Sequence, residues 1–590
     1  MNKINVKING INVSCTPGMT VLEAARQAGI DIPTLCFLKE INEIGACRMC
    51  VVELKGAKGL VASCVYPVFE GMEVFTNTEA VLRSRKLTLE LILSNHRKVC
   101  LTCVRSQNCE LQRMAQEFGV DHIRFGAEDK TPEIDASAAH LVRDNSKCIL
   151  CRRCVAVCRS NQGVSVIGPS DRGFQTHIAC AFDRDLDEVA CISCGQCTAV
   201  CPTGALIEKD QAAEVWAAIH DPAKHVVVGV APSIRVTLGE CFDLPIGTNV
   251  EGKMVAALRR LGFDGVFDVD VAADLTIMEE GTEFLQRLDS GENLPLITSC
   301  SPGWIRFCEH YYPEFIPNLS SCKSPQQMFG AMMKTYYAQK MGIDPEDLVV
   351  VSVMPCTAKK FEIEREDQQA VSGINDIDIA LTTRELARMI QNAGLLFTQL
   401  PDEQFDEAFG ISTGAGVIFG ATGGVMEAAL RTVVELVTGR EPERLEFSEV
   451  RGMKGIKEAA YVLRDRTVRV AVVSGTKNAS ALLELVKAGE AAYDMIEMMA
   501  CPGGCINGGG QPLQPGSVRN FVDIPGLRAE ALYDQDTAMS LRKSHENPIV
   551  KTLYEELLET PGSHTAHKLL HTNYKVGAKY PGMAAESEIF

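Results

Sequence analysis

The sequence lacks three features that would each indicate a class of partner or location. Positive charge is not in excess: 58 Lys and Arg face 76 Asp and Glu, for a formal net charge of −18, which argues against nucleic acid and anionic membrane surfaces as partners. No apolar run is long enough for a transmembrane helix. Residues 1–10 alternate like an amphipathic strand and lack the apolar core of a signal peptide. We therefore expect a cytoplasmic protein without a membrane span.

Cysteine, in contrast, is abundant, with 24 residues in a chain of 590. A chain of this length divides into several domains, and its hydrophobic content of 46% supplies their cores. Such domains do not need disulfide staples, and no export signal is visible. The cysteines cluster in short CxxC units, which favour iron–sulfur or zinc sites over disulfides.

The first cysteine group follows two predicted strands, Ile4 to Ile8 and Ile11 to Ser14, and a predicted helix from Thr20 to Ala28. Its spacing is C-x10-C-x2-C-x13-C, made by Cys36, Cys47, Cys50 and Cys64. Four thiolates suit zinc as well as iron. The loop over residues 43–50 resembles the cluster loop of plant-type ferredoxins, and the longer first gap resembles the related domain of complex I and hydrogenases. We infer a 2Fe–2S domain over 1–78, with Cys15 an ordinary buried thiol.

The second group combines a histidine with three cysteines in a region, 79–125, that is predicted to be helical. The ligands His96, Cys100, Cys103 and Cys109 are spaced H-x3-C-x2-C-x5-C. Zinc held by one imidazole and three thiolates is the plain alternative. The order resembles the His-ligated 4Fe–4S module of complex I and of hydrogenases. Imidazole in place of thiolate removes a negative charge, so we expect a raised potential.

A polar linker is predicted over 126–140, and an internal repeat follows within 139–210. Both units have the spacing C-x2-C-x2-C-x3-C, which resembles the two-cluster bacterial ferredoxin run, in which the fourth cysteine of each unit ligates the other cluster. By that rule two 4Fe–4S clusters are held by two sets: Cys148, Cys151, Cys154 with Cys201, and Cys191, Cys194, Cys197 with Cys158. Cys180 is left as a structural residue.

Residues 222–520 have a different pattern, in which apolar strands alternate with helices. Strands are predicted at His225–Val230, Leu294–Thr298, Leu348–Val353 and Val468–Val473, and helices at Lys253–Leu261, Glu280–Leu288, Gln326–Lys340 and Thr383–Gln391. This alternation indicates parallel α/β layers. Ligands bind beyond the carboxyl ends of such strands, and cysteine-containing segments follow two of them at 298–304 and 354–362.

A glycine-rich stretch, 497–512, carries Cys501 and Cys505. Two cysteines four apart would share one face of a helical turn, and the glycines would let the backbone approach a bulky group such as a cluster. We expect these two cysteines to join the strand-end segments at one site.

Three segments carry a resemblance to the signature motifs of FeFe hydrogenases. They are Thr-Ser-Cys-Ser-Pro-Gly-Trp at 298–304, Met-Pro-Cys-x-x-Lys-x-x-Glu at 354–362 and Glu-x-Met-Ala-Cys-x-x-Gly-Cys-x-x-Gly-Gly-Gly-x-Pro at 497–512. The N-terminal modules are similar to those of family members with four accessory clusters, and 525–590 resembles the small-subunit segment. Four tail histidines, His545, His564, His567 and His571, are expected in surface packing rather than at a metal.

The resemblance implies an H-cluster, a 4Fe–4S cubane joined through a cysteine to a two-iron unit with CO, cyanide and a dithiolate amine. It implies the reversible reaction of two protons and two electrons to H2. Cys356, Cys501 and Cys505 become cubane ligands, with Cys505 the bridge. Other contacts carried over are Lys359, Pro232 and Ser233 to cyanide, Gln326 to CO or cyanide, and Met354 and Met499 packed against the two-iron unit.

The fourth ligand departs from the family motif Thr-Ser-Cys-Cys-Pro-x-Trp. Ser301 occupies the ligand position and Cys300 the position of the proton relay. Three possibilities remain open: Ser301 ligates through its oxygen, Cys300 shifts and becomes the ligand, or the chain is altered. Thiolate is the better ligand for an iron–sulfur site. The rest of the implied proton route is Glu280, Ser320, Glu283 and Arg287, and Glu280 and Glu283 share a helix face.

The predicted fold is therefore multi-domain, α+β and α/β: ferredoxin-like iron–sulfur modules, a large α/β H-cluster domain and a helical C-terminal tail. The predicted function is that of a hydrogenase with one 2Fe–2S cluster, three accessory 4Fe–4S clusters and an H-cluster. Electron partners are ferredoxin or NAD(P)-linked flavoprotein and iron–sulfur subunits, since no GxGxxG fingerprint follows a strand, and maturation proteins supply the two-iron unit. The rivals are a hydrogen-sensing or iron–sulfur assembly relative and a complex I-like subunit.

Overall fold

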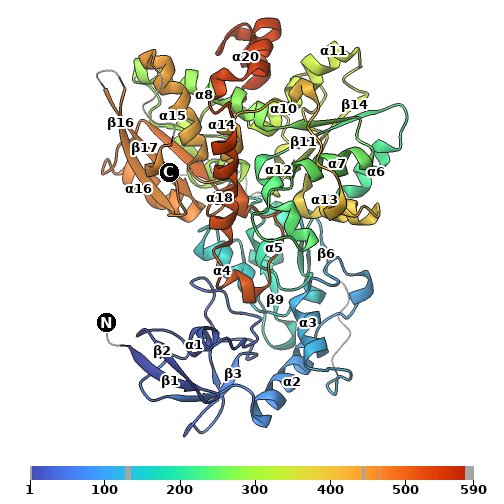
Figure 1. The fold of residues 1–590 in the computed structure, drawn as a ribbon, viewed down its shortest axis with the longest axis vertical. Helices are drawn as coiled ribbons and strands as arrows, with labels where there is room; N and C mark the ends of the chain where they lie inside the picture. The colour runs from blue at the N-terminus through green and yellow to red at the C-terminus, as the bar shows by residue number, and fades with distance from the viewer. Residues whose placement is uncertain (1–2, 127–133, 441–445, 464–465, 579–590) are drawn as a thin grey trace.

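The chain folds into several small N-terminal modules followed by one large domain. A computed structural model describes residues 3–126, 134–440, 446–463 and 466–578. In Figure 1 the N-terminal sheet lies at one end, the large domain at the other, and the cysteine repeat between them. Within these residues no helix combines the length and apolar character needed to cross a membrane.

The N-terminal domain is a five-stranded sheet in the order β2-β1-β5-β3-β4. Its strands are β1 (Ile4–Ile8), β2 (Ile11–Cys15), β3 (Val51–Leu54), β4 (Val61–Ala62) and β5 (Glu73–Phe75). Helix α1 (Val21–Gln27) begins at a capping box made by Thr20 and Glu23, which satisfies two backbone donors of the first turn. Cys15 is buried in this core, as predicted.

Two helices and a turn carry the second cysteine group: α2 (Glu79–Ser94), η1 (Cys100–Thr102) and α3 (Glu110–Glu117). The internal repeat that follows is visible in the backbone. Helices α4 (Arg153–Ser160) and α5 (Gln196–Val200) begin at equivalent points of the two units, each after a residue with positive φ, Arg152 and Gly195.

The linker prediction is partly wrong. Strand β6 (Ile134–Asp135) pairs with β7 (Leu141–Asp144), which also pairs with β10 (Leu206–Glu208), so the end of the expected linker belongs to a sheet. Residues 127–133 lie outside the described part of the chain. Strands β8 (Ile167–Ser170) and β9 (His177–Cys180) form a separate hairpin, and Cys180 is buried in the core of this module, as predicted for a structural thiol.

The large domain contains two four-stranded sheets, and the predicted parallel α/β layering is confirmed. The first is all parallel, in the order β12-β11-β14-β15. Its strands are β11 (His225–Val230), β12 (Gly265–Asp268), β14 (Leu348–Met354) and β15 (Ile379–Thr382). The second has the order β13-β18-β17-β16 with only the β16–β17 pair antiparallel. Its strands are β13 (Leu296–Ile297), β16 (Ile456–Leu463), β17 (Arg466–Ser474) and β18 (Met495–Met499).

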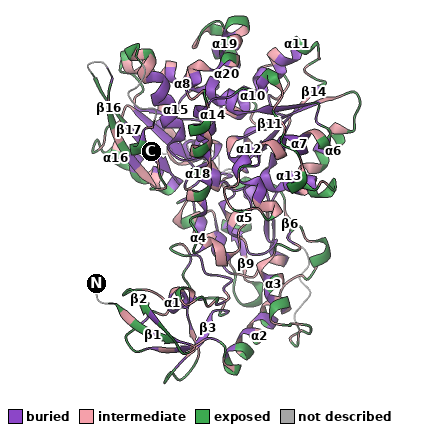
Figure 2. Cartoon of the chain, viewed as in Figure 1, coloured by how far each residue is buried: buried purple, intermediate pink, exposed green. Residues whose placement is uncertain are grey.

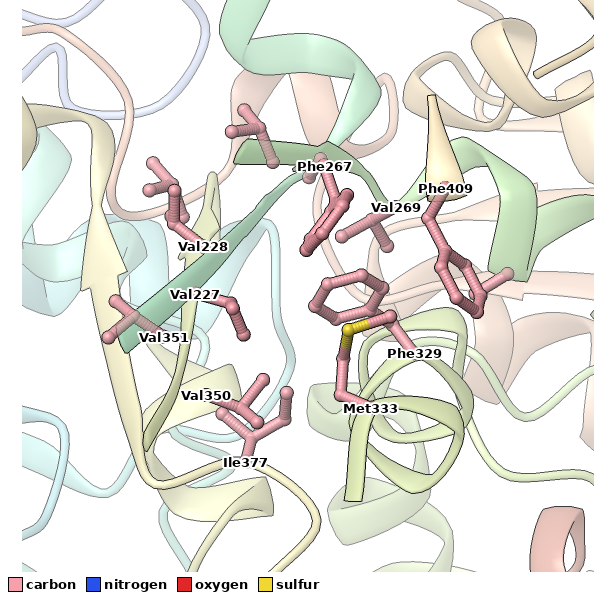
Figure 3. Close-up of a cluster of buried hydrophobic side chains, with 14 of the residues drawn as sticks. Val227, Val228, Phe267, Val269, Phe329, Met333, Val350, Val351, Ile377 and Phe409 are labelled. Atoms are coloured by element: carbon pink, nitrogen blue, oxygen red, sulfur yellow. The ribbon is translucent and has the colours of Figure 1, made fainter. Parts of the chain in front are cut away.

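Helices cover both sheets: α7 (Glu251–Leu261), α8 (Asp270–Ser290), α9 (Pro302–Tyr311), α12 (Ala358–Glu362), α13 (Thr383–Asn392), α15 (Gly424–Thr438) and α16 (Thr476–Lys487). Figure 3 shows the core of the first sheet, where Phe267 and Val227 face Phe329 of α10 (Pro325–Met332). The helix expected over 326–340 is confirmed: α10 continues through a π-helical turn (Met333–Tyr337) into α11 (Ala338–Met341) without a break.

The C-terminal segment is helical, with α18 (Ile524–Ala538), α19 (Pro548–Leu553) and α20 (His564–Leu570). It packs on the large domain, where buried residues are concentrated (Figure 2). The expectation of four surface histidines is wrong for His571, whose side chain is 6% exposed. After α20 the chain forms an antiparallel bridge between His571 and Cys322, which draws this histidine inward.

Candidate functional site

One cavity in the large domain collects the residues that follow four strands. The carboxyl ends of β11 and β14 in the first sheet, and of β13 and β18 in the second, all face it. The space not filled by protein atoms at this site is about 740 Å³, a volume that includes open solvent. The predicted convergence of the three cysteine-containing segments on one cavity is confirmed. The residues lining it include Pro232, Ser233, Cys300, Ser301, Gln326, Met354, Cys356, Lys359, Met499, Cys501 and Cys505.

Cys501 and Cys505 lie on a turn rather than on one face of a helix. The turn needs positive φ at Gly503 (84°) and Gly504 (96°), which glycine adopts without steric cost. The role expected for the other glycines also needs correction. A Cβ at Gly508 would lie 2.3 Å from the carbonyl oxygen of Pro355, and one at Gly509 would lie 2.4 Å from that of Cys194. These glycines admit neighbouring backbone, and so bring three segments together around the cavity.

Lys359 is held at the cavity wall by hydrogen bonds from its ammonium group. Its Nζ donates to the Ser324 hydroxyl (2.8 Å), the Glu362 carboxylate (2.9 Å) and the Cys300 carbonyl oxygen (3.3 Å). Gln326 donates from Nε2 to the same carboxylate of Glu362 at 2.9 Å. The cation and the amide are therefore fixed by one buried carboxylate.

Cys300 and Ser301 have different neighbours. Burial raises the pKa of the Cys300 thiol well above its usual value, and the nearby charges of Glu280 and Cys505 act in the same direction. The Ser301 hydroxyl instead accepts a hydrogen bond from the backbone N–H of Ala500 at 3.2 Å. The Cys300 thiol therefore lies near both Glu280 of α8 and Cys505, whereas the Ser301 hydroxyl lies against the backbone just before Cys501.

The predicted proton-route residues form a row in space that starts beside Cys300. Glu280 of α8 is buried, and burial raises its pKa to about 8. Ser320 and the backbone of Ser299 lie beside it, although no described residue makes a well-formed hydrogen bond to its carboxyl oxygens. The Ser320 hydroxyl donates to Glu283 at 3.1 Å, and Arg287 donates to the same carboxylate at 2.6 Å.

The two ferredoxin-type cysteine sets line two separate cavities. Cys148, Cys151, Cys154 and Cys201 border the first. Cys158, Cys191, Cys194 and Cys197 border the second. The exchange of the fourth cysteine between repeat units, inferred from spacing, agrees with these groupings.

The first cysteine group is buried except for Cys47, which is half-buried. In the N-terminal domain the Cys50 and Cys64 sulfurs are 3.3 Å apart, and the backbone N–H of Cys47 donates to the Cys36 sulfur at 3.4 Å.

In the second group His96 is largely enclosed, its Nδ1 has no hydrogen-bond partner among the described residues, and burial lowers its pKa to about 4. Cys103 and Cys109 are partly exposed and Cys100 is exposed. The unprotonated imidazole that this burial favours is the form that binds a metal.

The pattern of the sequence did not identify Gln196 or Phe419. Phe419 adds an apolar wall to the large cavity. Gln196 donates from Nε2 to the Cys501 sulfur (3.2 Å) and to the Asn507 carbonyl oxygen (2.8 Å). The sequence signal that could have identified Gln196 is its position between Cys194 and Cys197, because that cysteine unit directly borders the Cys501 loop in the structure.

The donor set of the large cavity fits an iron–sulfur group. Three thiols, a fourth thiol or hydroxyl, apolar walls and one fixed cation match the preference of soft metals for thiolate and the shielding of such sites from water.

Comparison with known proteins assigns the modules. The model for the iron only hydrogenase large subunit, C-terminal domain, matches residues 224–509, and that for the iron hydrogenase small subunit matches 523–576. A 2Fe-2S iron-sulfur cluster binding domain matches 1–79, the NADH-ubiquinone oxidoreductase-G iron-sulfur binding region matches 85–124, and a 4Fe-4S dicluster domain matches 147–205. The chain belongs to the iron-only, or FeFe, hydrogenase family.

The relatives are similar over almost their whole length. The NADP-reducing hydrogenase subunit HndD of Solidesulfovibrio fructosivorans is 48% identical over 585 residues, which are 97% of this chain and 99% of the relative. Iron hydrogenase 1 of Clostridium pasteurianum is 44% identical, over 96% of this chain and 99% of the relative. Among solved structures, apo FeFe-hydrogenase HydA1 of Chlamydomonas reinhardtii matches with a TM-score of 0.56 and 44% identity, over 63% of this chain and all of that chain.

Proposed function

We propose that the chain makes and oxidises H2 at an H-cluster in the large cavity, with electrons passing through one 2Fe–2S and three accessory 4Fe–4S clusters. The convergence of Cys356, Cys501 and Cys505 on one cavity carries this proposal. When bound, the H-cluster supplies the iron at which hydrogen is formed or split and the amine base beside it. The chain binds that group, excludes water and delivers protons and electrons.

The residues assigned to the accessory clusters are those of the four cysteine groups. Cys36, Cys47, Cys50 and Cys64 would hold the 2Fe–2S cluster, and His96, Cys100, Cys103 and Cys109 the first 4Fe–4S cluster. The two cavities of the repeat would hold the others. The hydrogen bond from Gln196 to Cys501 places the second repeat unit next to the Cys501 loop, so electrons would enter the large domain there.

The fourth ligand is Ser301 and the proton relay is Cys300 in this proposal. The Ser301 hydroxyl lies beside the Cys501 loop, whereas the Cys300 thiol lies near Glu280. A proton leaving Cys300 would reach Glu280 and then the hydrogen-bonded Ser320 and Glu283, with Arg287 fixing the Glu283 carboxylate.

Lys359, Pro232, Ser233 and Gln326 would contact the diatomic ligands of the two-iron unit, and Met354 and Met499 would pack against it. Of these, Lys359 offers the firmest support, because three acceptors hold its ammonium group at the cavity wall. A fixed cation of this kind suits anionic cyanide.

Infrared spectra of the anaerobically matured protein test the H-cluster itself. CO and cyanide bands are expected, and their absence would refute the assignment. Bands accompanied by negligible H2 evolution would favour the hydrogen sensor instead.

The roles of Cys300 and Ser301 are tested by two exchanges in that matured protein. Cys300→Ser should keep the infrared bands and lose at least about 100-fold in turnover, the scale of a lost proton-transfer group. Ser301→Cys should keep the bands and raise turnover, because it supplies the softer ligand. If Cys300→Ser instead loses the cubane signal in electron paramagnetic resonance, Cys300 is the ligand and the assignment is wrong.

The electron partner is ferredoxin or a set of NAD(P)-linked flavoprotein and iron–sulfur subunits. The similarity to a relative named as an NADP-reducing hydrogenase subunit supports the second. A nicotinamide acceptor would place the enzyme in the cytoplasm, and maturation proteins would insert the two-iron unit. Ferredoxin, NAD(P)H and methyl viologen tested as donors to the purified chain separate the two: turnover with ferredoxin alone would contradict the need for partner subunits.

A further inference from the structure

A cysteine, a histidine and a glutamate outside the large cavity gather at the outer end of the proposed proton route. One ligand atom from each of Glu283, Cys322 and His571 lies within 4.8 Å of the other two. The three side chains come from α8, from the short segment before α10 and from the residue that follows α20. We propose that they form a binding site for a divalent ion of the zinc type, and that the bound ion blocks the route; the blocking role rests on the function proposed above.

The backbone fixes two of the three positions. Besides the antiparallel bridge between Cys322 and His571, the N–H of Lys323 donates to the Leu570 carbonyl and the N–H of Thr572 to the Ser321 carbonyl, both at 2.8 Å. The thiol and the imidazole therefore belong to one short ladder. A site on such a ladder is held more precisely than one on independent loops.

The third position is fixed by hydrogen bonds to the carboxylate. Glu283 accepts from Arg287 at 2.6 Å and from the backbone N–H of Ser321 at 3.0 Å. Its Oε2 lies 3.8 Å from the Cys322 sulfur. The carboxylate is thus aimed at the thiol before any ion arrives.

The histidine is oriented for metal binding. Glu279 accepts a hydrogen bond from Nε2 of His571 at 3.1 Å, and the Ser321 hydroxyl lies 2.8 Å from Nδ1. With the hydrogen on Nε2, the lone pair of Nδ1 points to the side of Ser321, where the ligand set lies. A carboxylate behind a ligating histidine is the usual support of protein zinc sites.

The donor set selects the type of ion. Sulfur, imidazole nitrogen and carboxylate oxygen together suit Zn²⁺, with the Ser321 hydroxyl or a water as fourth ligand. Cys322 is fully buried, and the side chains of Glu283 and His571 are 13% and 6% exposed. Binding would release one proton, from the Cys322 thiol. The Glu283 oxygen that accepts from Ser320 would then be occupied, so protons could not pass.

The test is a titration of the matured enzyme with ZnCl2 under anaerobic conditions. Three quantities are measured: zinc retained after gel filtration, the X-ray absorption edge of zinc, and the rate of H2 evolution, with iron content checked throughout. We expect one retained zinc with sulfur in its first coordination shell, and inhibition that a chelator reverses.

Variants identify the ligands. Cys322→Ser and His571→Gln should bind zinc at least 10-fold more weakly, and Glu279→Gln, which leaves all three ligands in place, should weaken binding about 10- to 100-fold. His564→Gln and Cys308→Ser are the controls, because His564 is exposed and Cys308 is a buried thiol of a different core cluster, and both should bind zinc like the parent.

Equal zinc uptake by Cys322→Ser, Glu279→Gln and the parent would overturn the site. Glu283→Gln tests the proton route separately, without zinc. If it keeps full turnover, the route and the blocking role both fail, while zinc retention and the absorption edge still decide whether the site exists.

Discussion

Gly509→Ala tests the contact between the Cys501 loop and the repeat module. A Cβ at this position would lie 2.4 Å from the Cys194 carbonyl oxygen and 2.6 Å from the Gly195 Cα. Ordinary contact begins at 3.4 Å, so the two segments must separate by about 3.4 − 2.4 = 1.0 Å. Because backbone lies on the far side of the contact, no change of side-chain rotamer can relieve it.

The expected penalty is that of overpacking, about 1–3 kcal/mol. The same displacement weakens two hydrogen bonds to the Gly509 carbonyl oxygen, from Thr198 at 3.0 Å and Arg384 at 2.9 Å. The Thr198 bond joins the repeat module to the large domain, and Arg384, itself in the large domain, also pairs with Glu208 of the repeat module. The variant should therefore lose the junction between modules before it loses either core.

The assay is the rate of heat inactivation of H2 evolution, because a chain of several domains is described by a rate rather than by one equilibrium. If the contact is broken in the transition state for unfolding, 1–3 kcal/mol corresponds to roughly 5- to 150-fold faster inactivation. Gly168→Ala is the matched control, since its Cβ would meet nothing within 4 Å. A Gly509→Ala variant that inactivates at the rate of the control would refute the reasoning.

Two further predictions concern the same junction. Burial opposes ionisation of Glu208, but the charges of Arg384 and Arg388 outweigh burial and hold the pKa of Glu208 well below the usual range. This lowered pKa stabilises the fold above pH 4.5, and the stabilisation is lost as the pH falls further. In measurements of the inactivation rate, Glu208→Gln should therefore inactivate faster than the parent at pH 7 and differ less from it at pH 3. The control is Glu490→Gln, at an exposed position. A difference that does not change with pH would contradict the ion pair. Gln196→Leu removes the hydrogen bond to the Cys501 sulfur. Because such a bond contributes about 0.5–1.5 kcal/mol, the reduction potential of the cubane should fall on the order of 20–60 mV. An unchanged potential in a redox titration followed by electron paramagnetic resonance would contradict this role of Gln196.

Patterns local in sequence predicted most of the fold. Strand β11 has the bounds expected from its apolar run, His225–Val230, because a strand buried on both faces needs continuous apolar residues. The groups of ferredoxin-type thiols expected from the cysteine spacings agree with the two cavities, because each cavity is bordered by three cysteines of one unit and the fourth of the other.

Contacts between segments far apart in the chain could not be predicted from local sequence patterns. His571 is drawn inward by its pairing with Cys322, 249 residues earlier in the chain, a contact that no local sequence pattern reveals. The glycines after Cys505 were expected to admit a cluster, but a Cβ would meet Pro355 or Cys194 backbone, 153 and 315 residues away along the chain from Gly508 and Gly509 respectively. Such positions depend on how the modules dock, which no local period encodes.

The geometry of the segment after β13 also bears on the serine that replaces a cysteine of the family motif. Ser301 has extended backbone, with φ −99° and ψ 101°, and successive side chains on extended backbone point to opposite sides. The two adjacent side chains therefore point in different directions: the Cys300 thiol lies near Glu280 and Cys505, and the Ser301 hydroxyl accepts from the backbone N–H of Ala500. A single thiol at Cys300 could not serve as relay and ligand at once, and moving it to the ligand side would require rotating the backbone that begins α9. In the site proposed above, Cys300 therefore keeps the thiol on the proton route, and Ser301 offers a hydroxyl where the cubane would be held.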